Sequence, residues 1–253
     1  MIRADDDGGN AYGSYADDGP ERFEVDLGGQ RWIVERDADL EALWEDMVSE
    51  DENRTAACPE FADDERLPYW TEVWPASILL AHWCAKNKAL VQGKRVLDLG
   101  CGLGLIAMVA ASLGGRVVGM DYEHPALVNA RRIARLNASN LGNIGALNWV
   151  VMDWRKNAFT PNAFPLVLCG DIMYESRFGP PLARFLSQTI ARDGRAVLAE
   201  PSRDVFAAFR SAADSEGLAV SRMVQERVYA GQVRPFGDSG HGVTVNLWEI
   251  TLL

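Results

Sequence analysis

The sequence contains no apolar run that approaches the ~20 residues needed to cross a bilayer. Its longest apolar candidate, residues 103–113, has the length of a short buried helix. The N-terminus turns acidic directly after Met-Ile-Arg, without the apolar segment of a secretory signal. No internal repeat is visible. These absences predict a globular protein with no membrane partner, and 253 residues suffice for one large domain.

Cysteine and histidine, the usual ligands of zinc, are also scarce. The chain has four cysteines and three histidines, with no C-x-x-C pair and no ligand-like spacing. Three of the cysteines, Cys84, Cys101 and Cys169, lie in apolar stretches, where a free thiol behaves as a small hydrophobe. We therefore expect no metal site. Reduced thiols are typical of a cytoplasmic protein, which is the location we expect.

Positive charge is in short supply at the N-terminal end. The whole chain has 25 Lys and Arg against 36 Asp and Glu, a net charge of −11. Residues 1–66 hold 21 of the acids and 6 of the bases, a net charge of −15, so the remainder carries +4. An acidic surface opposes contact with phosphates, so we expect no nucleic-acid partner. It suits a basic protein substrate better.

Three regions follow from the pattern along the chain. Residues 1–20 are rich in Asp, Gly, Tyr and Ser without periodicity, which predicts a disordered acidic tail. Residues 21–66 form an extension with a β-hairpin over 23–35, turning at Gly28-Gly29, and a helix over 39–49. Residues 67–253 form the main domain. The apolar faces of the extension should pack on that domain, near the acceptor entrance.

The main domain alternates between strand and helix patterns. This alternation predicts an α/β, Rossmann-like, doubly wound and mostly parallel sheet. The last two strands have no helix between them, which predicts an antiparallel hairpin at one edge. The expected strands are 95–99, 115–120, 147–152, 166–169, 195–199, 219–229 and 244–252, and the expected helices are 105–113, 125–138, 181–191 and 205–215.

The sharpest local motif joins the first of these strands to its helix. It reads Asp98-Leu-Gly100-Cys-Gly102-Leu-Gly104. Glycines allow a tight turn and the close approach of a ligand, and the helix N-terminus offers free N–H groups. A phosphate-binding loop would avoid the acid at its start. Asp98 instead suits a ligand that carries a cationic ammonium and sulfonium.

The next three strands also end in carboxylates. Asp121 ends the second strand, where an acid can accept from both ribose hydroxyls. Asp153-Trp154 ends the third strand, where the carboxylate can accept from an adenine amino group and the indole can cover the ring. Asp171 ends the fourth strand. Taken singly, each acid could be a helix cap, and Trp154 could be a core residue. Together they predict a nucleoside site at the carboxyl edge of the sheet.

A nicotinamide dinucleotide is the rival ligand. Gly102-x-Gly104-x-x-Ala107 fits the G-x-G-x-x-A pattern, and Asp121 follows at 19 residues. Asp98, the additional Gly100 and the terminal hairpin argue against that fold.

From Asp98 through Asp121, Asp153-Trp154 and Asp171, residues 67–253 resemble the seven-β-strand (class I) S-adenosylmethionine-dependent methyltransferases. The resemblance implies S-adenosylmethionine as cofactor, with S-adenosylhomocysteine as product. It also implies the strand order 3-2-1-4-5-7-6, with the seventh strand antiparallel.

Further segments resemble one group, the protein-lysine methyltransferases of methyltransferase family 16, which includes the electron-transfer-flavoprotein β-subunit enzymes. They are residues 67–77, Asp171-Ile-Met-Tyr174 and Glu200-Pro-Ser-Arg203. The resemblance implies that Asp171 and Tyr174 lie beside the acceptor as catalytic residues and that Trp74 covers the cofactor. Asp171 would hold the incoming ammonium, and Tyr174 would orient the amine. The expected cofactor-binding residues are Trp74, Asp98, Gly100, Gly102, Gly104, Asp121, Tyr122, Asp153, Trp154 and Asp171.

Two other functions stay open from the sequence. One is a small-molecule N- or O-methyltransferase, which a closed acceptor pocket would favour. The other is a non-catalytic protein that binds S-adenosylmethionine. Tyr174 could also be a core tyrosine that caps the sheet edge.

Overall fold

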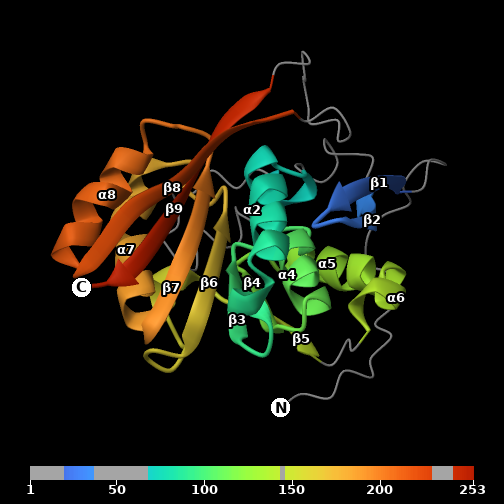
Figure 1. Cartoon of the computed structure of the whole chain (residues 1–253), viewed down its shortest axis with the longest axis horizontal. Coiled ribbons are helices and arrows are strands. Elements are labelled where there is room, and N and C mark those ends of the chain that lie inside the picture. The colour runs from blue at the N-terminus through green and yellow to red at the C-terminus, as the bar shows by residue number, and fades with distance from the viewer. Residues whose placement is uncertain (1–19, 37–67, 143–145, 230–241) are drawn as a thin grey trace, which may run out of the picture.

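A seven-stranded sheet forms the centre of the protein (Figure 1). The computed structural model describes residues 20–36, 68–142, 146–229 and 242–253. The strands of the sheet are β3 (Arg95–Leu99), β4 (Arg116–Asp121), β5 (Leu147–Val151), β6 (Phe164–Gly170), β7 (Ile190–Glu200), β8 (Leu218–Val228) and β9 (Val243–Leu252). Their order is β5-β4-β3-β6-β7-β9-β8.

The topology confirms the predicted fold class. Neighbouring strands from β5 to β7 are parallel, whereas β9 runs antiparallel to both β7 and β8. Numbered from β3 as the first strand, this order is 3-2-1-4-5-7-6. The carboxyl ends of the parallel strands therefore meet at one edge of the sheet, where open α/β folds bind ligands.

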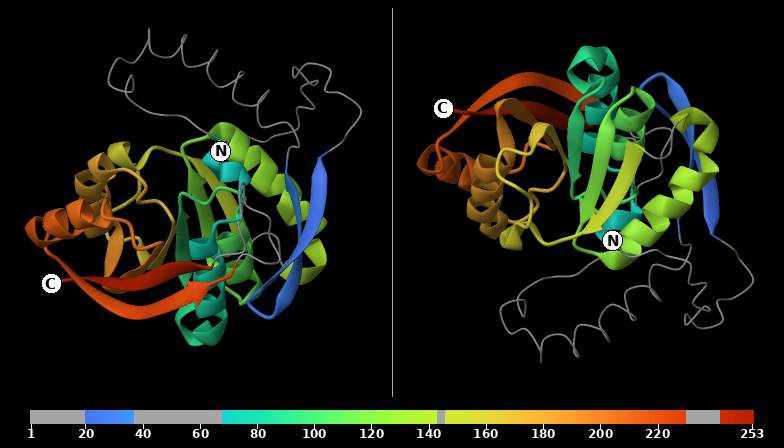
Figure 2. Two further views of the ribbon diagram at one scale, coloured as in Figure 1. Left: turned by 90° about the horizontal axis from the view of Figure 1, so that it is seen from above. Right: turned by 90° about the horizontal axis from the view of Figure 1, so that it is seen from below.

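Helices cover both faces of the sheet (Figures 1 and 2). Along β6, Leu166 and Leu168 belong to the core on one face, and Val167 and Cys169 to the core on the other. One face carries α2 (Pro75–Lys86), α4 (Leu105–Ser112) and α5 (His124–Leu136), and the other carries α7 (Gly179–Thr189) and α8 (Phe206–Ser215). Short helical turns are α3 (Lys88–Val91), α6 (Ala138–Leu141), η2 (Tyr69–Thr71), η4 (Trp154–Lys156) and η5 (Ser176–Phe178). In the described part of the chain, no helix has the length and apolar character needed to cross a membrane.

Helix α2 is the main element that the sequence analysis missed. It begins at Pro75, which is favourable in the first turn because proline has no N–H to lose. Its apolar residues do not keep to one face, because the helix packs against the sheet, against α4 and against the N-terminal hairpin. A helix that is covered on several sides lacks the single apolar stripe by which sequence patterns are recognised.

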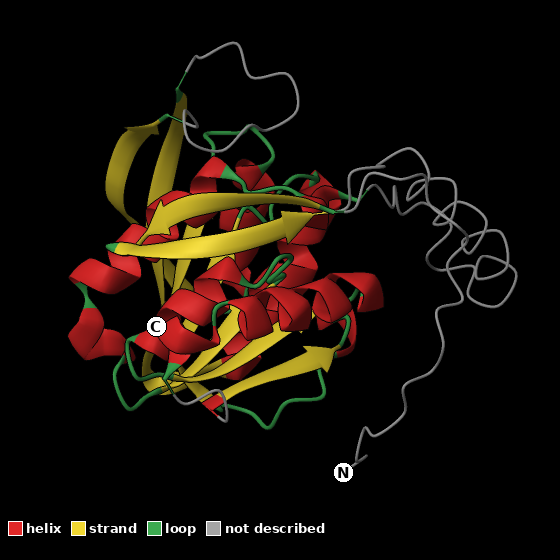
Figure 3. Cartoon of the chain, turned by 90° about the vertical axis from the view of Figure 1, so that its right-hand side faces the viewer, coloured by secondary structure: helices red, strands yellow, loops and turns green. Residues whose placement is uncertain are grey.

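The predicted β-hairpin is present. Strands β1 (Glu21–Leu27) and β2 (Gln30–Arg36) pair antiparallel around Gly28-Gly29, and both glycines have positive φ. Trp32 is fully buried, and its indole donates to the Leu27 carbonyl. Figure 3 shows the hairpin lying across the helices that cover the sheet. The helix expected over 39–49 and the tail 1–19 lie outside the described residues.

The hairpin packs on the domain as predicted, but not at the entrance of the cavity described below. It lies against α5 and beside α2 and α4, and none of its residues lines that cavity. The Asn137 side chain makes two hydrogen bonds with the Ile33 backbone, one in each direction, at 2.7–2.8 Å. Asn140 donates to the Arg31 carbonyl at 2.7 Å. The hairpin is therefore an integral part of the helical layer.

Candidate functional site

A cleft opens at the carboxyl edge of the parallel strands. Its larger compartment has about 800 Å³ of empty space including the open mouth, and loops after β3, β4 and β6 line it together with residues 69–74. A smaller compartment of about 370 Å³ shares Gly100, Asp121, Tyr122, Trp154 and Tyr174 with the larger one. The predicted position of a nucleoside site therefore coincides with a cleft.

The glycine loop forms the floor of the larger compartment. Gly100 has φ +66°, and a Cβ there would lie 2.6 Å from the Ile172 side chain. Gly104 begins α4 with φ +74°, and a Cβ there would lie 2.5 Å from the Trp149 ring. These two glycines make room for neighbouring side chains of the protein itself. Gly100 and Gly102 line the cleft, whereas Gly104 does not.

Asp98 lies beneath this loop instead of facing the cleft. It is fully buried, and its Oδ2 accepts a hydrogen bond of 2.8 Å from the Ala107 backbone in the first turn of α4. Among the described residues, Oδ1 has no hydrogen-bond partner. The pKa of Asp98 is raised to about 7, mainly because the carboxyl is buried; the Ala107 hydrogen bond opposes this rise, and the nearby charge of Asp121 adds to it. Asp98 can therefore act on a cationic ligand in the cleft only through its electrostatic field, without direct contact.

Asp121 holds the turn between β4 and α5 and faces both compartments. Its Oδ2 accepts from the Gly102 backbone at 2.9 Å and its Oδ1 from the Glu123 backbone at 3.0 Å. Burial raises the pKa of Asp121 to about 6, although both of these hydrogen bonds lower it. Each carboxylate oxygen can accept more than one hydrogen bond, so further acceptor capacity is available to a ligand.

The smaller compartment combines an apolar wall with a charged rim. Trp154 contacts Phe178 edge to face, with ring centroids 5.8 Å apart, and Met120 and Met152 complete the wall. Asp153 follows β5 as predicted, but its carboxylate already binds the Arg155 guanidinium at 2.7–3.0 Å. This arrangement suits a flat heteroaromatic ring with polar edges.

Asp171 ends β6 and lines the larger compartment, where it is paired with a cation. Its φ of +56° is unusual for a residue with a side chain, and its backbone N–H donates to the Ala199 carbonyl at 2.9 Å. Arg203 contacts Oδ1 through Nη1 at 2.6 Å and Oδ2 through Nη2 at 3.5 Å. The sequence analysis singled out both residues but not this pair. An acceptor ammonium would therefore meet a carboxylate whose charge is already balanced.

Aromatic side chains form the wall beside Asp171. Tyr174 lies between Tyr69 and Phe178, with ring centroids 5.4 Å and 5.1 Å away. Trp74 donates its indole N–H to the Tyr69 carbonyl at 2.8 Å and contacts the Tyr69 ring edge to face at 6.1 Å. Trp74, Tyr69 and Tyr174 all line the larger compartment, as does Tyr122. Tyr174 is thus a wall residue of the cleft and not a fully buried core tyrosine.

Two residues that line the cleft, and one that packs against its glycine loop, carry no motif of their own. Tyr69 and Ile172 each lie within a predicted segment but were assigned no role. Trp149 fills the space left by Gly104 and Gly119. Its only sequence signal was a large residue in a strand, beside a strand that contains a single glycine, which is too common to identify a site.

Comparisons with known proteins identify the family. The family model described as lysine methyltransferase matches residues 62–212. The electron transfer flavoprotein beta subunit lysine methyltransferase of Xenopus laevis is 32% identical over 142 residues, which cover 55% of this chain and 54% of the relative. Protein N-lysine methyltransferase METTL21A of Danio rerio is 32% identical over 133 residues, 52% of this chain and 60% of the relative. The chain spans about half the length of the curated relatives that it matches.

Solved structures show the same fold. A candidate RNA methyltransferase from Pyrococcus horikoshii superposes with a TM-score of 0.56 at 15% identity, over 76% of this chain and 91% of that chain. Magnesium protoporphyrin IX methyltransferase from Synechocystis, with bound S-adenosylmethionine, gives 0.50 at 18% identity, over 68% and 76%. The fold is that of S-adenosylmethionine-dependent methyltransferases, and because the family model covers more than half of its residues, the chain belongs to the lysine methyltransferase family.

Proposed function

We propose that the protein transfers a methyl group from S-adenosylmethionine to a lysine amine of a protein substrate. The observation that carries this proposal is the cleft in which Asp121, Trp154, Asp171 and Tyr174 meet at the carboxyl edge of the sheet. Family membership supports the reaction class, and the named curated relatives support a protein lysine as acceptor. The nicotinamide alternative has no support among these relatives.

The residues present fit the cofactor. Asp121 has acceptor capacity at the position expected for the ribose, and the wall of Trp154, Phe178 and two methionines suits adenine. Asp121 and the buried Asp98, whose Oδ1 has no hydrogen-bond partner in the described part of the chain, make the region around the glycine loop favourable for a cation. When bound, S-adenosylmethionine supplies an electrophilic methyl carbon to an in-line displacement.

The acceptor residues act by alignment. A lysine amine must lose its proton before its nitrogen can form the new N–C bond as the S–C bond breaks, and the methylated ammonium later releases a proton to water. Tyr174 can orient the neutral amine through its hydroxyl group, and the aromatic wall of Tyr69 and Trp74 excludes water from the alkyl chain. A basic protein partner and a cytoplasmic location remain part of the proposal.

Transfer of a labelled methyl group tests the proposal. The protein is incubated with methyl-labelled S-adenosylmethionine and an unmethylated cell extract, and the label is traced after separation of proteins from small molecules. We expect label in protein, at a lysine side chain after hydrolysis. Tyr174→Phe should lower the rate of labelling while leaving the affinity for S-adenosylhomocysteine nearly unchanged.

Other outcomes of the same experiment would replace the proposal. Label only in small molecules would favour a small-molecule N- or O-methyltransferase. S-adenosylhomocysteine binding without any labelled product would favour a non-catalytic cofactor-binding protein.

A further inference from the structure

Arg203 lies directly behind Asp171 and outside the cleft. It lines neither compartment, yet its guanidinium reaches both carboxylate oxygens of Asp171. The Asp171 side chain is 4% exposed, so its charge has little water to stabilise it. A planar guanidinium is the cation best suited to meet two carboxylate oxygens at once.

The turn that carries Arg203 is held in place by hydrogen bonds to Glu200 and to strand β9. The Arg203 backbone N–H donates to Glu200 Oε2 at 3.0 Å. Glu200 is buried, and its Oε1 accepts from Asn246 at 2.8 Å and from the Trp248 indole at 3.0 Å. Ser202, between them, has φ +48° and accepts from Asn246 at 2.7 Å. Strand β9 therefore holds a strained turn in the one conformation that presents Arg203 to Asp171.

The pair sets the charge at the acceptor end of the cleft. Burial raises the pKa of the Asp171 carboxyl above its usual range, Arg203 acts in the opposite direction, and Glu200 raises it further. The other acids that line the same compartment are Glu72, Asp121 and Glu123. An unbalanced carboxylate beside an amine would stabilise the ammonium form, which has no lone pair to react.

We propose that Arg203 is a positioning residue for methyl transfer, which holds the Asp171 side chain in place and balances its charge so that the acceptor amine binds in its neutral form. This inference rests on the proposed function for its kinetic consequence, but the Arg203–Asp171 pair itself can be tested without turnover.

The first test follows the Asp171 carboxyl directly. Protein labelled with ¹³C at the aspartate carboxyls is titrated by NMR with S-adenosylhomocysteine bound, and the Asp171 signal is assigned with Asp171→Asn. Arg203→Met should raise the protonation midpoint by about one pH unit or more, a tenfold change in proton affinity. Arg203→Lys keeps the positive charge but lacks the two-pronged guanidinium, so it should raise the protonation midpoint of Asp171 less. An unchanged midpoint in Arg203→Met would overturn the proposal.

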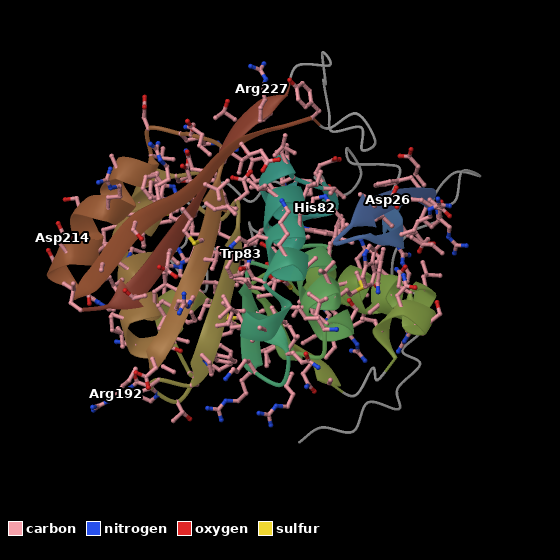
Figure 4. All side chains as sticks on the ribbon, in the orientation of Figure 1. Asp26, His82, Trp83, Arg192, Asp214 and Arg227 are labelled. Carbon is pink, nitrogen blue, oxygen red and sulfur yellow. The ribbon has the colours of Figure 1, made fainter. Side chains whose placement is uncertain are left out.

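The second test uses the labelled extract between pH 6.5 and 9.5. Arg203→Met should move the rising limb of the rate toward alkaline pH by about one unit, so that the rate falls about tenfold below the wild-type midpoint and approaches the wild-type rate above the shifted midpoint. The matched control is Arg192→Met, an exposed arginine at the opposite end of β7 (Figure 4), which should follow the wild type. A loss of the same size above and below an unchanged midpoint would mean a merely structural role and would also overturn the proposal.

A double variant separates the effect on the pH profile from an effect of misfolding. Asp171→Asn combined with Arg203→Met leaves no buried charge unpaired, so its fold should survive. In the Asp171→Asn background, the Arg203 substitution should cause no further shift of the pH profile. A further shift would show that Arg203 does not act through Asp171. If the wild type labels nothing, the proposed function fails, while the NMR titration still decides whether Arg203 controls Asp171.

Discussion

At the scale of single residues, Asp121 has a double task, since it supports the glycine loop and faces the cleft. If it also accepts from the ribose hydroxyls, Asp121→Ala should lose charge-assisted hydrogen bonds worth roughly 1.5–3 kcal/mol, or about ten- to hundredfold in affinity for S-adenosylhomocysteine. Isothermal titration calorimetry measures this loss, with the exposed Asp193→Ala as control. Unchanged affinity in a folded Asp121→Ala protein would remove Asp121 from the site. Binding of NAD by the wild type would revive the nicotinamide alternative.

Asp98 predicts a dependence of stability on pH. Its pKa is raised to about 7 in the folded state, so the native protein binds more protons than the unfolded chain between about pH 4 and 7. Stability must then fall as pH rises through this window. Asp98→Asn removes that cost, so the variant should match the wild type near pH 4 and exceed it by on the order of 4 kcal/mol at pH 8. Denaturant titrations of the ligand-free proteins measure the difference, and a gap that does not grow with pH contradicts the prediction.

At the scale of elements, one asparagine fastens the N-terminal hairpin to the helical layer. Asn137 is buried, and its side chain satisfies both the N–H and the carbonyl of Ile33 while also donating to the Ile133 carbonyl. Asn137→Ala would leave partly buried backbone groups of Ile33 without this partner, which should cost about 2–4 kcal/mol in the free energy of unfolding. Asn140→Ala is the matched control, because the single hydrogen bond it removes is exposed and should cost about 1 kcal/mol or less.

The same pair of variants tests whether the hairpin is separate from the site. None of the hairpin residues lines the cleft, so Asn137→Ala should bind S-adenosylhomocysteine with nearly wild-type affinity at a temperature where it is folded. A large loss of affinity would mean that the hairpin shapes the cleft from a distance.

The elements also show which parts of the fold and of the site could be predicted from the sequence. The strands were predictable because each is a short apolar run bounded by turn residues. The acids Asp121, Asp153 and Asp171 were identifiable because each lies at or just after the end of a strand. Helix α2 was missed because it is buried on several sides. The Arg203–Asp171 pair was also out of reach, because it joins residues 32 positions apart through a turn whose shape depends on Glu200 and β9. Side-chain contacts between loops depend on the tertiary structure, so no local sequence pattern predicts them.

At the scale of the whole molecule, charge is divided between the N-terminal segment and the rest. Residues 1–66 carry a net charge of −15 and the remainder +4. Strand β1 begins at Glu21, so deletion of residues 1–19 removes several of these acids and leaves the hairpin intact. We predict that the carboxylates of this segment guide a basic protein substrate toward the cleft. Such steering weakens as salt is added, because the Debye length falls from ~10 Å at 0.1 M to ~3 Å at 1 M.

Deletion of residues 1–19 should therefore leave folding and S-adenosylhomocysteine affinity intact but lower kcat/KM for a protein acceptor at low salt. The full-length and truncated proteins should converge as salt increases, because the difference lies in the rate of encounter and not in the chemistry. The measurement is a series of kcat/KM values for both proteins on the acceptor identified by methyl labelling, from about 0.02 M to about 0.5 M salt. Equal values across the whole series would mean that the acidic segment contributes solubility alone, and a deficit that is independent of salt would point to a direct contact instead of steering.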